Sequence, residues 1–262
     1  MSTPAHSSPT TLEAALVLIA QQQAEIARLQ QSHEGWMRAV AHDLRAPLRH
    51  VVSFAPLLQE SVQELAAAAP QAPDAAEDAR EFTATMEQAA RKMSLMLDGM
   101  AQVSRVARAP LHLGLVDWSA ATQDVVELMQ AQQPHVHWEL PTAPAPVMAD
   151  THSLHTLTQA LLENAVKFSA RQLQPVVRIH VEPLPHGWWR WVVQDNGAGF
   201  DAERASTLGQ LFQRMHRDTD FEGAGCGLAV VSTLVERHGG RWQIHAQPQQ
   251  GCTVSVDLPG AF

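Results

Sequence analysis

Four groups of residues in this chain of 262 residues have types and spacings that could perform chemistry. The first is His42, which lies directly before Asp43 in a stretch with helical periodicity. A neutral imidazole is a good nucleophile near neutral pH, and a neighbouring carboxylate can fix its tautomer and accept the displaced proton. The chain has 14 histidines, and most of them need no chemical role. His42 is therefore singled out by its neighbours rather than by its residue type.

The second group lies on a predicted helix over residues 152–168. Asn164 and Lys167 are three residues apart and so share one helix face, with Phe168 directly after them. An amide oxygen is a hard ligand that suits Mg²⁺, and a lysine can meet the charge of a phosphate. The alternative is an ordinary exposed helix turn, so this pair indicates a phosphate site only together with the remaining groups.

The third group begins at Asp195, which closes an apolar predicted strand. Gly197, Gly199 and Phe200 follow it. A carboxylate there can accept a hydrogen bond from an exocyclic amine, and glycines let the backbone approach a base closely. An Asp-Asn-Gly hairpin turn is the alternative, but no second strand follows directly after Phe200.

The fourth group is a glycine-rich loop with Gly223, Gly225 and Gly227, and it leads into an apolar run that starts at Leu228. Such a loop before a helix presents free backbone N–H groups and the positive end of the helix dipole to phosphates. A flexible linker is the alternative, but linkers seldom end in a buried helix. The sequence contains neither a P-loop nor a dinucleotide-binding glycine fingerprint.

Composition excludes several classes of protein. The net charge is −9, which argues against a nucleic-acid partner. The two cysteines form no metal-ligand pattern and no disulfide framework, which favours a reducing, cytoplasmic location. No apolar run approaches the roughly 20 residues that cross a bilayer, and the first residues do not resemble a signal peptide. We expect no membrane insertion and no sensory domain of appreciable size within the chain.

The N-terminal half has helical periodicity. Apolar residues spaced by seven predict one long helix over residues 12–65, and a Pro- and Ala-rich connector is expected over residues 66–78. A second helix is expected to end before Pro110. Two such helices cannot bury both apolar faces alone, whereas two hairpins can form a four-helix bundle, so we expect a homodimer. The expected units are a tail and signalling helix, a dimerisation domain and a C-terminal domain, at residues 1–35, 36–110 and 111–262.

In the C-terminal half, stretches with strand periodicity alternate with stretches of helical periodicity. This pattern predicts an α/β sandwich, with mixed strands on one side and helices on the other. The strands are expected at residues 135–140, 176–181, 188–193 and 252–258. The helices are expected at residues 119–130, 152–168 and 228–238. A hairpin turn is expected at residues 185–187.

Residues 41–48 resemble the H box of bacterial sensor histidine kinases, with a dimerisation domain of the HisKA type, and are most similar to phytochrome-like soluble kinases. The resemblance implies that His42 is the phosphoacceptor and Asp43 its partner acid or base. Many members carry Asn or Thr four residues after the histidine to align a water for dephosphorylation. This chain has Ala46 there, which argues against that phosphatase activity.

The other groups resemble the N, G1 and G2 boxes of the GHKL (Bergerat) ATP-binding domain, with residues 211–217 similar to the F box. The resemblance implies that Asn164 is the magnesium ligand and that Asp195 selects adenine. Phosphate or nucleotide contacts are implied for the following residues: Lys167, Phe168, Gly197, Gly199, Phe200, Phe212, Arg214, Gly223, Gly225, Gly227 and Leu228. Residues 217–223 would form a lid over ATP. The family often has a second asparagine where this chain has Ala160.

The expected function is ATP- and Mg²⁺-dependent autophosphorylation of His42, followed by transfer to an aspartate in the receiver domain of a response regulator. A separate sensor protein is an expected further partner. Two alternatives remain: a non-catalytic phosphorelay or scaffold dimer with a degenerate nucleotide site, which Ala160 would favour, and a gyrase- or chaperone-like ATPase, which the H box disfavours.

Overall fold

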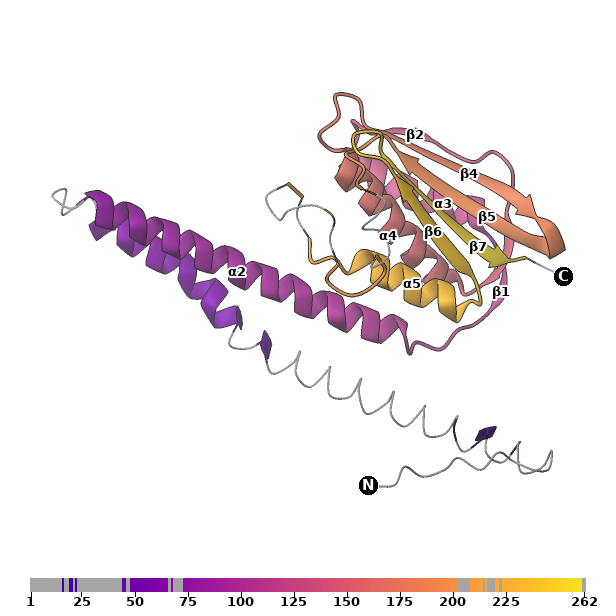
Figure 1. Ribbon diagram of the computed structural model, residues 1–262, viewed down its shortest axis with the longest axis horizontal. Coiled ribbons are helices and arrows are strands. Elements are labelled where there is room, and N and C mark those ends of the chain that lie inside the picture. Colours follow the sequence, from indigo (N-terminus) through magenta and orange to yellow (C-terminus); the bar gives the residue numbers. More distant parts are fainter. Residues whose placement is uncertain are drawn as a thin grey trace, which may run out of the picture.

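The computed structural model describes residues 44–45, 48–65, 73–201, 208–213, 215, 220–221 and 223–260, together with isolated positions at 16, 19, 20, 22 and 67. This part of the chain forms a helical arm followed by an α/β region (Figure 1). No helix within the described ranges is both long and apolar enough to cross a lipid bilayer.

The arm consists of the helical residues 48–65 and of α2 (Pro73–Val106), which lie side by side. A small apolar core joins the two helices. Its buried members are Leu48, Ala90 and Leu97, with Val52 packed against them. Arg45 adds an ion pair across the arm, with Nη2 3.2 Å from Oδ1 of Asp98. Residues 12–43, where the first helix was expected to begin, lie outside the described residues apart from isolated helical positions.

The expectation that a connector runs through residue 78 is wrong, because α2 already begins at Pro73. Proline is well suited to the first turn of a helix, where its missing N–H has no intrahelical acceptor and its φ angle is already helical. The second helix ends before Pro110, as expected.

The α/β region is built on a five-stranded sheet with the order β2-β4-β5-β7-β6. The strands are β2 (His137–Glu139), β4 (Val176–Leu184), β5 (Trp188–Asp195), β7 (Cys252–Pro259) and β6 (Arg241–Ala246). Only the β2–β4 pair is parallel in this sheet, which confirms the expected mixture of strand directions. The expected turn at residues 185–187 joins β4 to β5. A separate antiparallel pair, β1 (Gly114–Asp117) and β3 (Pro146–Ala149), was not predicted.

Three helices cover one face of the sheet: α3 (Trp118–Gln132), α4 (Thr151–Ser169) and α5 (Gly227–Arg237) (Figure 1). Asp117 and Asp150 cap the first two, because their carboxylates accept hydrogen bonds from the backbone N–H groups of Ser119 and Ser153 at 3.0 and 2.8 Å. These caps fix where α3 and α4 begin.

Two fully buried tryptophans form the centre of the core between helices and sheet. The rings of Trp118 and Trp191 stack with centroids 5.5 Å apart and planes 6° from parallel. Each indole N–H donates to a buried threonine hydroxyl, Trp118 to Thr158 and Trp191 to Thr122, at 3.0 and 2.9 Å. Large aromatic rings are therefore buried without leaving their polar atoms unpaired. This core holds α3 and α4 against β5, the strand that ends at Asp195.

Candidate nucleotide site

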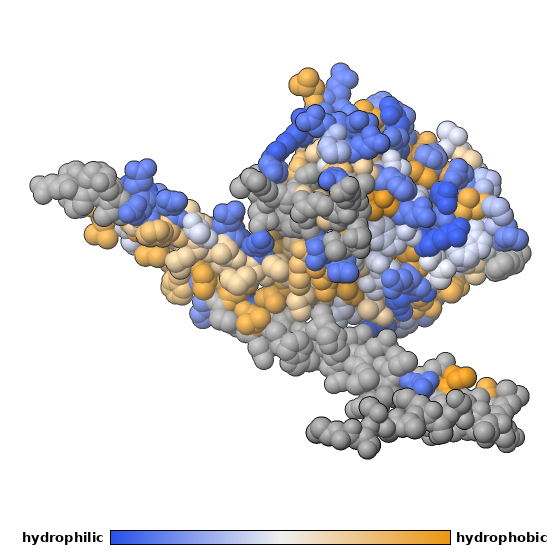
Figure 2. All heavy atoms as spheres, in the orientation of Figure 1, coloured by the Kyte–Doolittle hydropathy of each residue, from blue (hydrophilic) through white to orange (hydrophobic). Residues whose placement is uncertain are grey.

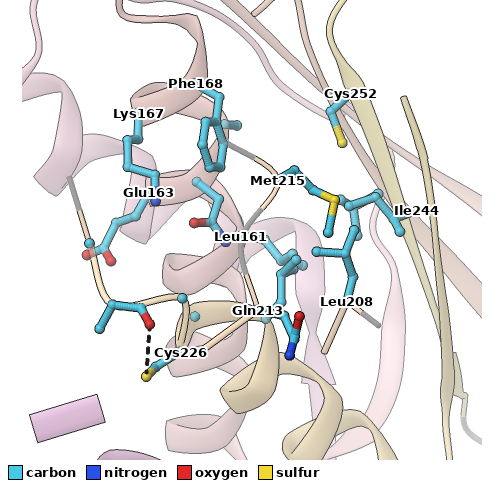
Figure 3. A pocket seen from close by; sticks show the side chains of 18 of the residues that line it. Leu161, Glu163, Lys167, Phe168, Leu208, Gln213, Met215, Cys226, Ile244 and Cys252 are labelled. Carbon is cyan, nitrogen blue, oxygen red and sulfur yellow. Dashed lines mark hydrogen bonds between the residues drawn. The ribbon is translucent and has the colours of Figure 1, made fainter. Parts of the chain in front are cut away.

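A cavity of about 490 Å³ lies where α4, the end of β5 and the loop before α5 meet. This volume is in the range of small-molecule sites. Ten of the residues singled out from the sequence line the cavity: Asn164, Lys167, Phe168, Asp195, Gly199, Phe200, Gly223, Gly225, Gly227 and Leu228. Figure 3 shows Lys167 and Phe168 projecting from α4 on one side of it. The fold thus brings together three segments that are separated by roughly 30 residues each, although the role of each residue stays a prediction.

Five other singled-out residues do not belong to this lining. Gly197 lies beside it, and Phe212 is linked to it through a hydrogen bond from its backbone N–H to the carbonyl of Gly225 at 3.1 Å. His42, Asp43 and Arg214 lie outside the described residues. Their assigned roles as phosphoacceptor, acid or base and phosphate ligand therefore stay predictions.

Asp195 is the buried carboxylate of the cavity, with 7% of its surface exposed. Burial raises the pKa of this carboxyl to about 6, because charge is disfavoured away from water. Its Oδ1 accepts hydrogen bonds from the backbone N–H groups of Gly197 and Cys252, at 2.8 and 3.3 Å. Within the described part of the chain, no hydrogen bond reaches Oδ2. This second oxygen can therefore accept from an amine of a ligand.

Gly197 holds the end of β5 against α4. A Cβ atom at this position would overlap the backbone carbonyl of Phe168, and the next residue, Ala198, donates its N–H to that carbonyl at 3.1 Å. Only glycine allows so close a backbone approach. The contact explains why the motif at Asp195 and the motif at Asn164, which are about 30 residues apart in sequence, lie at one cavity.

Asn164 lies against the first turn of α5. Its Nδ2 would be 3.3 Å and its Oδ1 3.6 Å from a Cβ placed on Gly227, and the same helix brings Glu163 to the cavity. The described residues contain no cluster of three or more His, Cys, Asp or Glu side chains that could hold a metal ion by themselves. Mg²⁺ is usually bound through one or two protein oxygens plus phosphate oxygens. The amide of Asn164 and the carboxylate of Glu163 therefore fit Mg²⁺ that arrives with a nucleotide.

One wall of the cavity is apolar, and it was not predicted from the sequence. Its members are Leu161, Val193, Leu208, Met215, Ile244, Cys252 and Val254. Figure 3 shows Leu208, Met215 and Ile244 close together on this side. An apolar slot beside a buried carboxylate can take a flat heteroaromatic ring that carries an amine. In the sequence these residues look like ordinary core positions, so no local signal separates them from the rest of the core.

Helix α2 supplies a further part of the wall, which was not expected either. Its contributing residues are Leu95, Asp98, Gly99 and Gln102. The cavity is therefore formed by the α/β region together with a helix of the arm. The one local signal for this contact is a glycine inside a long helical pattern.

Arg171 fastens the segment that precedes the glycine-rich loop. Its Nη1 lies 3.3 Å from Oδ1 of Asp220, and its Nη2 donates to the backbone carbonyl of the same residue at 2.5 Å. The guanidinium also lies 4.8 Å from the ring centre of Phe221, which packs edge to face on Phe168 with centroids 5.1 Å apart. Because Phe168 lines the cavity, Arg171 ties the expected lid to the nucleotide side of α4.

The comparisons with known proteins agree with this geometry. Residues 149–261 match the family described as histidine kinase-, DNA gyrase B-, and HSP90-like ATPase. The chain is 28% identical to cyanobacterial phytochrome A of a Nostoc species, over 84% of this chain and 27% of that protein. It is also 28% identical to the phytochrome-like protein Cph1 of a Synechocystis species, over 96% of this chain and 33% of that protein. Residues 149–261 are therefore similar to the ATPase domain of histidine kinases, and the chain is similar to phytochrome-like relatives over most of its length. It spans about a third or less of the length of these two relatives.

Solved histidine kinase structures have the same fold. The mycobacterial sensor histidine kinase MprB matches with a TM-score of 0.50 and 25% identity, over 56% of this chain and 97% of that one. Full-length ShkA, solved in complex with AMPPNP, matches with a TM-score of 0.57 and 22% identity, over 86% of this chain and 46% of that one. The second likeness concerns the fold alone. It extends beyond the α/β region into the helical arm.

Proposed function

We propose that this chain binds ATP with Mg²⁺, phosphorylates its own His42 and passes the phosphoryl group to an aspartate of a response regulator. The observation that carries the proposal is the convergence of three separated sequence signals on one cavity, around Asn164, Asp195 and Gly225. The histidine kinase relatives and the nucleotide analogue bound to ShkA agree with it.

In this proposal, the carboxylate of Asp195 accepts a hydrogen bond from the exocyclic amine of adenine, and the apolar wall receives the ring. The ammonium of Lys167 lies 4.3 Å from the ring centre of Phe168 and close to the glycine-rich loop, where a Cβ on Gly223 would be 3.5 Å from Nζ. Lys167 and the loop N–H groups would therefore bind the phosphates. Mg²⁺, held by Asn164 and assisted by Glu163, would supply charge neutralisation at the phosphates.

The transfer step then takes place at His42. A ring nitrogen attacks the γ-phosphorus, the bond to the β–γ bridging oxygen breaks, and ADP leaves. The ring proton passes to Asp43, which also fixes the tautomer. In the second step, a carboxylate oxygen of the regulator attacks the same phosphorus and the imidazole leaves.

A homodimer forms part of the proposal, and the exposed apolar surface of the arm supports it. Figure 2 shows hydrophobic side chains along this arm. Exposed members include Val51, Phe54, Leu57, Leu58, Phe82, Met86 and Met93. A second copy of the arm would cover this surface in a four-helix bundle. The cytoplasmic location stays a prediction.

The proposal is tested with ATP labelled on the γ-phosphate. We expect the full chain to acquire label that is lost in acid and retained in base, as expected for phosphohistidine, and His42→Gln to acquire none. His50→Gln is the matched control, because His50 is an exposed histidine on the same arm. We expect this variant to label at the wild-type rate.

Two other outcomes would contradict the kinase proposal. ATP binding without labelling of the chain would favour the non-catalytic relay, the alternative that the apolar Ala160 suggested. Steady ATP turnover that persists in His42→Gln would favour an ATPase.

Because Ala46 replaces the side chain that aligns water, we also expect no dephosphorylation of the regulator by this chain.

Arg171→Ala should raise the KM for ATP by about 3- to 10-fold and leave the rate at saturating ATP within about twofold, because the variant loosens the lid without touching the reacting atoms. Initial rates of labelling at several ATP concentrations give the KM and the rate at saturating ATP separately. The KM of Arg171→Lys should lie between those of the wild type and Arg171→Ala, because lysine keeps the charge but not the planar, forked set of N–H donors.

The matched control for Arg171 is Arg178→Ala, which breaks an exposed pair with Glu139 at 2.9 Å on the outer part of the sheet. This variant should keep the wild-type KM. Equal KM values in Arg171→Ala, Arg171→Lys and Arg178→Ala would show that Arg171 does not position the lid.

A further inference from the structure

The turn between β6 and β7, residues 247–251, lies against the loop that follows Asp195. The backbone N–H of Gln249 donates to the carbonyl of Ala198 at 2.7 Å. On the other side, the N–H of Ala198 donates to the carbonyl of Phe168 in α4 at 3.1 Å. The loop after β5 is therefore held between a helix and a turn that comes much later in the sequence.

Two glycines allow the turn and the loop to approach so closely. A Cβ atom on Gly199 would overlap the carbonyl oxygen of Gln247, and a Cβ atom on Gly251 would overlap the carbonyl oxygen of Asp195. Both glycines also have positive φ angles, +55° and +85°, which other residues rarely adopt. Neither position can therefore carry a side chain unless the turn moves away from the loop.

This contact gives Gly199 a structural reason besides the expected close approach to a base. The residue lines the cavity. However, the space that its missing side chain leaves is taken by the backbone carbonyls of Gln247 and Gly251. The glycine thus makes room for the turn as well as for a ligand.

The end of the turn also contacts Asp195 itself. Gly251 packs against the backbone carbonyl of Asp195, and the N–H of Cys252 donates to Oδ1 of the carboxylate at 3.3 Å. Asp195 and Cys252 are directly opposite each other in the β5–β7 pair. The turn therefore fixes both the backbone of Asp195 and one oxygen of its carboxylate, and Oδ2 is left for a ligand.

One residue of the turn is held in an unfavourable backbone conformation. Gln249 has a φ angle of +62°, which is uncommon for a residue other than glycine. Such a conformation persists only where the surrounding structure holds it. Because residues 247–250 are exposed, the hydrogen bond to Ala198 is the contact that can hold Gln249 in place.

We propose that residues 247–251 are a positioning element for base recognition, which holds Asp195 so that Oδ2 meets the amine of adenine. This proposal rests on the proposed function, and Gly251 acts through Asp195 rather than on the nucleotide. A nucleotide whose base lacks the amine should be rejected fully only while the turn is in place. Inosine triphosphate is a suitable probe, because it carries a carbonyl oxygen where ATP carries the amine.

Gly251→Ala tests the turn, because its methyl group would meet the carbonyl of Asp195. We expect the wild type to prefer ATP to inosine triphosphate by roughly 100-fold, because two acceptor oxygens would face each other in the inosine complex. Gly251→Ala should lower this preference at least about tenfold. Displacement of a fluorescent ATP analogue by each nucleotide measures both affinities. A general loss of packing would instead weaken both nucleotides equally.

A second variant avoids the clash in case Gly251→Ala does not fold. Two glycines inserted between Gln249 and Gln250 lengthen an exposed turn and remove its tie to Ala198. This insertion should lower the preference for ATP at least about threefold. Gly239→Ala is the matched control, because Gly239 has a φ angle of +68° but a Cβ there would meet nothing within 4 Å. The control adds similar backbone strain at another turn and should keep the wild-type preference.

Amide hydrogen exchange reports on the contact without any nucleotide. We expect the amides of residues 196–199 to exchange at least about tenfold faster in both turn variants than in the wild type and in Gly239→Ala. Circular dichroism checks that each variant remains folded. Wild-type exchange in the folded turn variants would overturn the proposal.

The two measurements together separate the possible failures. Faster exchange with an unchanged preference for ATP would show that the turn holds the loop but does not direct base recognition, which also overturns the proposal. Absence of analogue binding in the wild-type chain would instead refute the proposed function, while the exchange rates would still decide whether the turn holds the loop after Asp195.

Discussion

Asp195→Asn should lower the affinity for ATP by roughly 100-fold, the effect of losing a buried hydrogen bond to a charged acceptor, worth about 2–3 kcal/mol. The asparagine can keep Oδ1 as acceptor for the N–H groups of Gly197 and Cys252. Its amide NH₂ then replaces Oδ2 and faces the amine of adenine, donor against donor. Titration with a fluorescent ATP analogue measures the loss.

The same carboxyl predicts a pH dependence. Because burial raises the pKa of Asp195 to about 6, the acceptor form is depleted below that pH. The affinity of the wild-type chain for ATP should be constant above about pH 7 and fall about tenfold per unit well below pH 6. Asp195→Asn should show no such dependence between pH 5 and 7. An equal slope in both proteins would assign the titration to another group.

Stability should change in the opposite sense to affinity. The raised pKa means that the protonated carboxyl favours the folded state, so this contribution is complete below the ordinary value of 3.8 and is lost as the pH rises to about 6. At pH 7.5 the wild-type domain carries the unfavourable buried charge. Asp195→Asn should therefore unfold at a higher temperature than the wild type at pH 7.5, although it binds ATP weakly.

Asn164→Ala should lower the affinity for ATP by at least about tenfold when Mg²⁺ is present, because it removes the oxygen that fits the metal. In the presence of EDTA, the variant and the wild type should bind ATP equally. This difference separates metal binding from a packing role, since Asn164 also touches the start of α5. Isothermal titration with and without Mg²⁺ measures both affinities.

His152→Ala is the control for the metal experiment, because His152 is exposed on the same helix and does not line the cavity. It should bind ATP normally under both conditions. A loss of affinity in Asn164→Ala that is equal with and without Mg²⁺ would argue that Asn164 shapes the cavity rather than holding the metal.

The long, strongly patterned elements were predictable from the sequence. The expected ranges for α3, α4, α5, β4, β5 and β7 overlap the observed ones to within a few residues, because their apolar positions recur with helix or strand periods over nearly their full lengths. β1 and β3 were missed because each has only four residues, and their pairing depends on distant segments. β6 was also missed, although Arg241, Gln243 and His245 alternate with apolar residues as in a half-buried strand.

For the site, the sequence predicted the polar and glycine-rich rim but not the apolar wall. Asparagine, aspartate and closely spaced glycines are unusual where they stand, whereas Val193 and Ile244 look like any other sheet residue. The contribution of α2 could not be predicted from the sequence, because its one local signal, Gly99, has meaning only once Cys226 lies against it. Residues that act through tertiary contacts leave the weakest signals.

The stacked Trp118–Trp191 pair has a practical consequence for spectroscopy. The chain contains no tyrosine, and all seven tryptophans except Trp36 lie at or after residue 118. Ultraviolet emission and near-ultraviolet circular dichroism will therefore be dominated by the α/β region, and the parallel rings 5.5 Å apart should produce a coupled signal that vanishes when this region melts. The far-ultraviolet signal comes from the helices of both parts, so a change there that does not coincide with the loss of the tryptophan signal marks the melting of the helical arm.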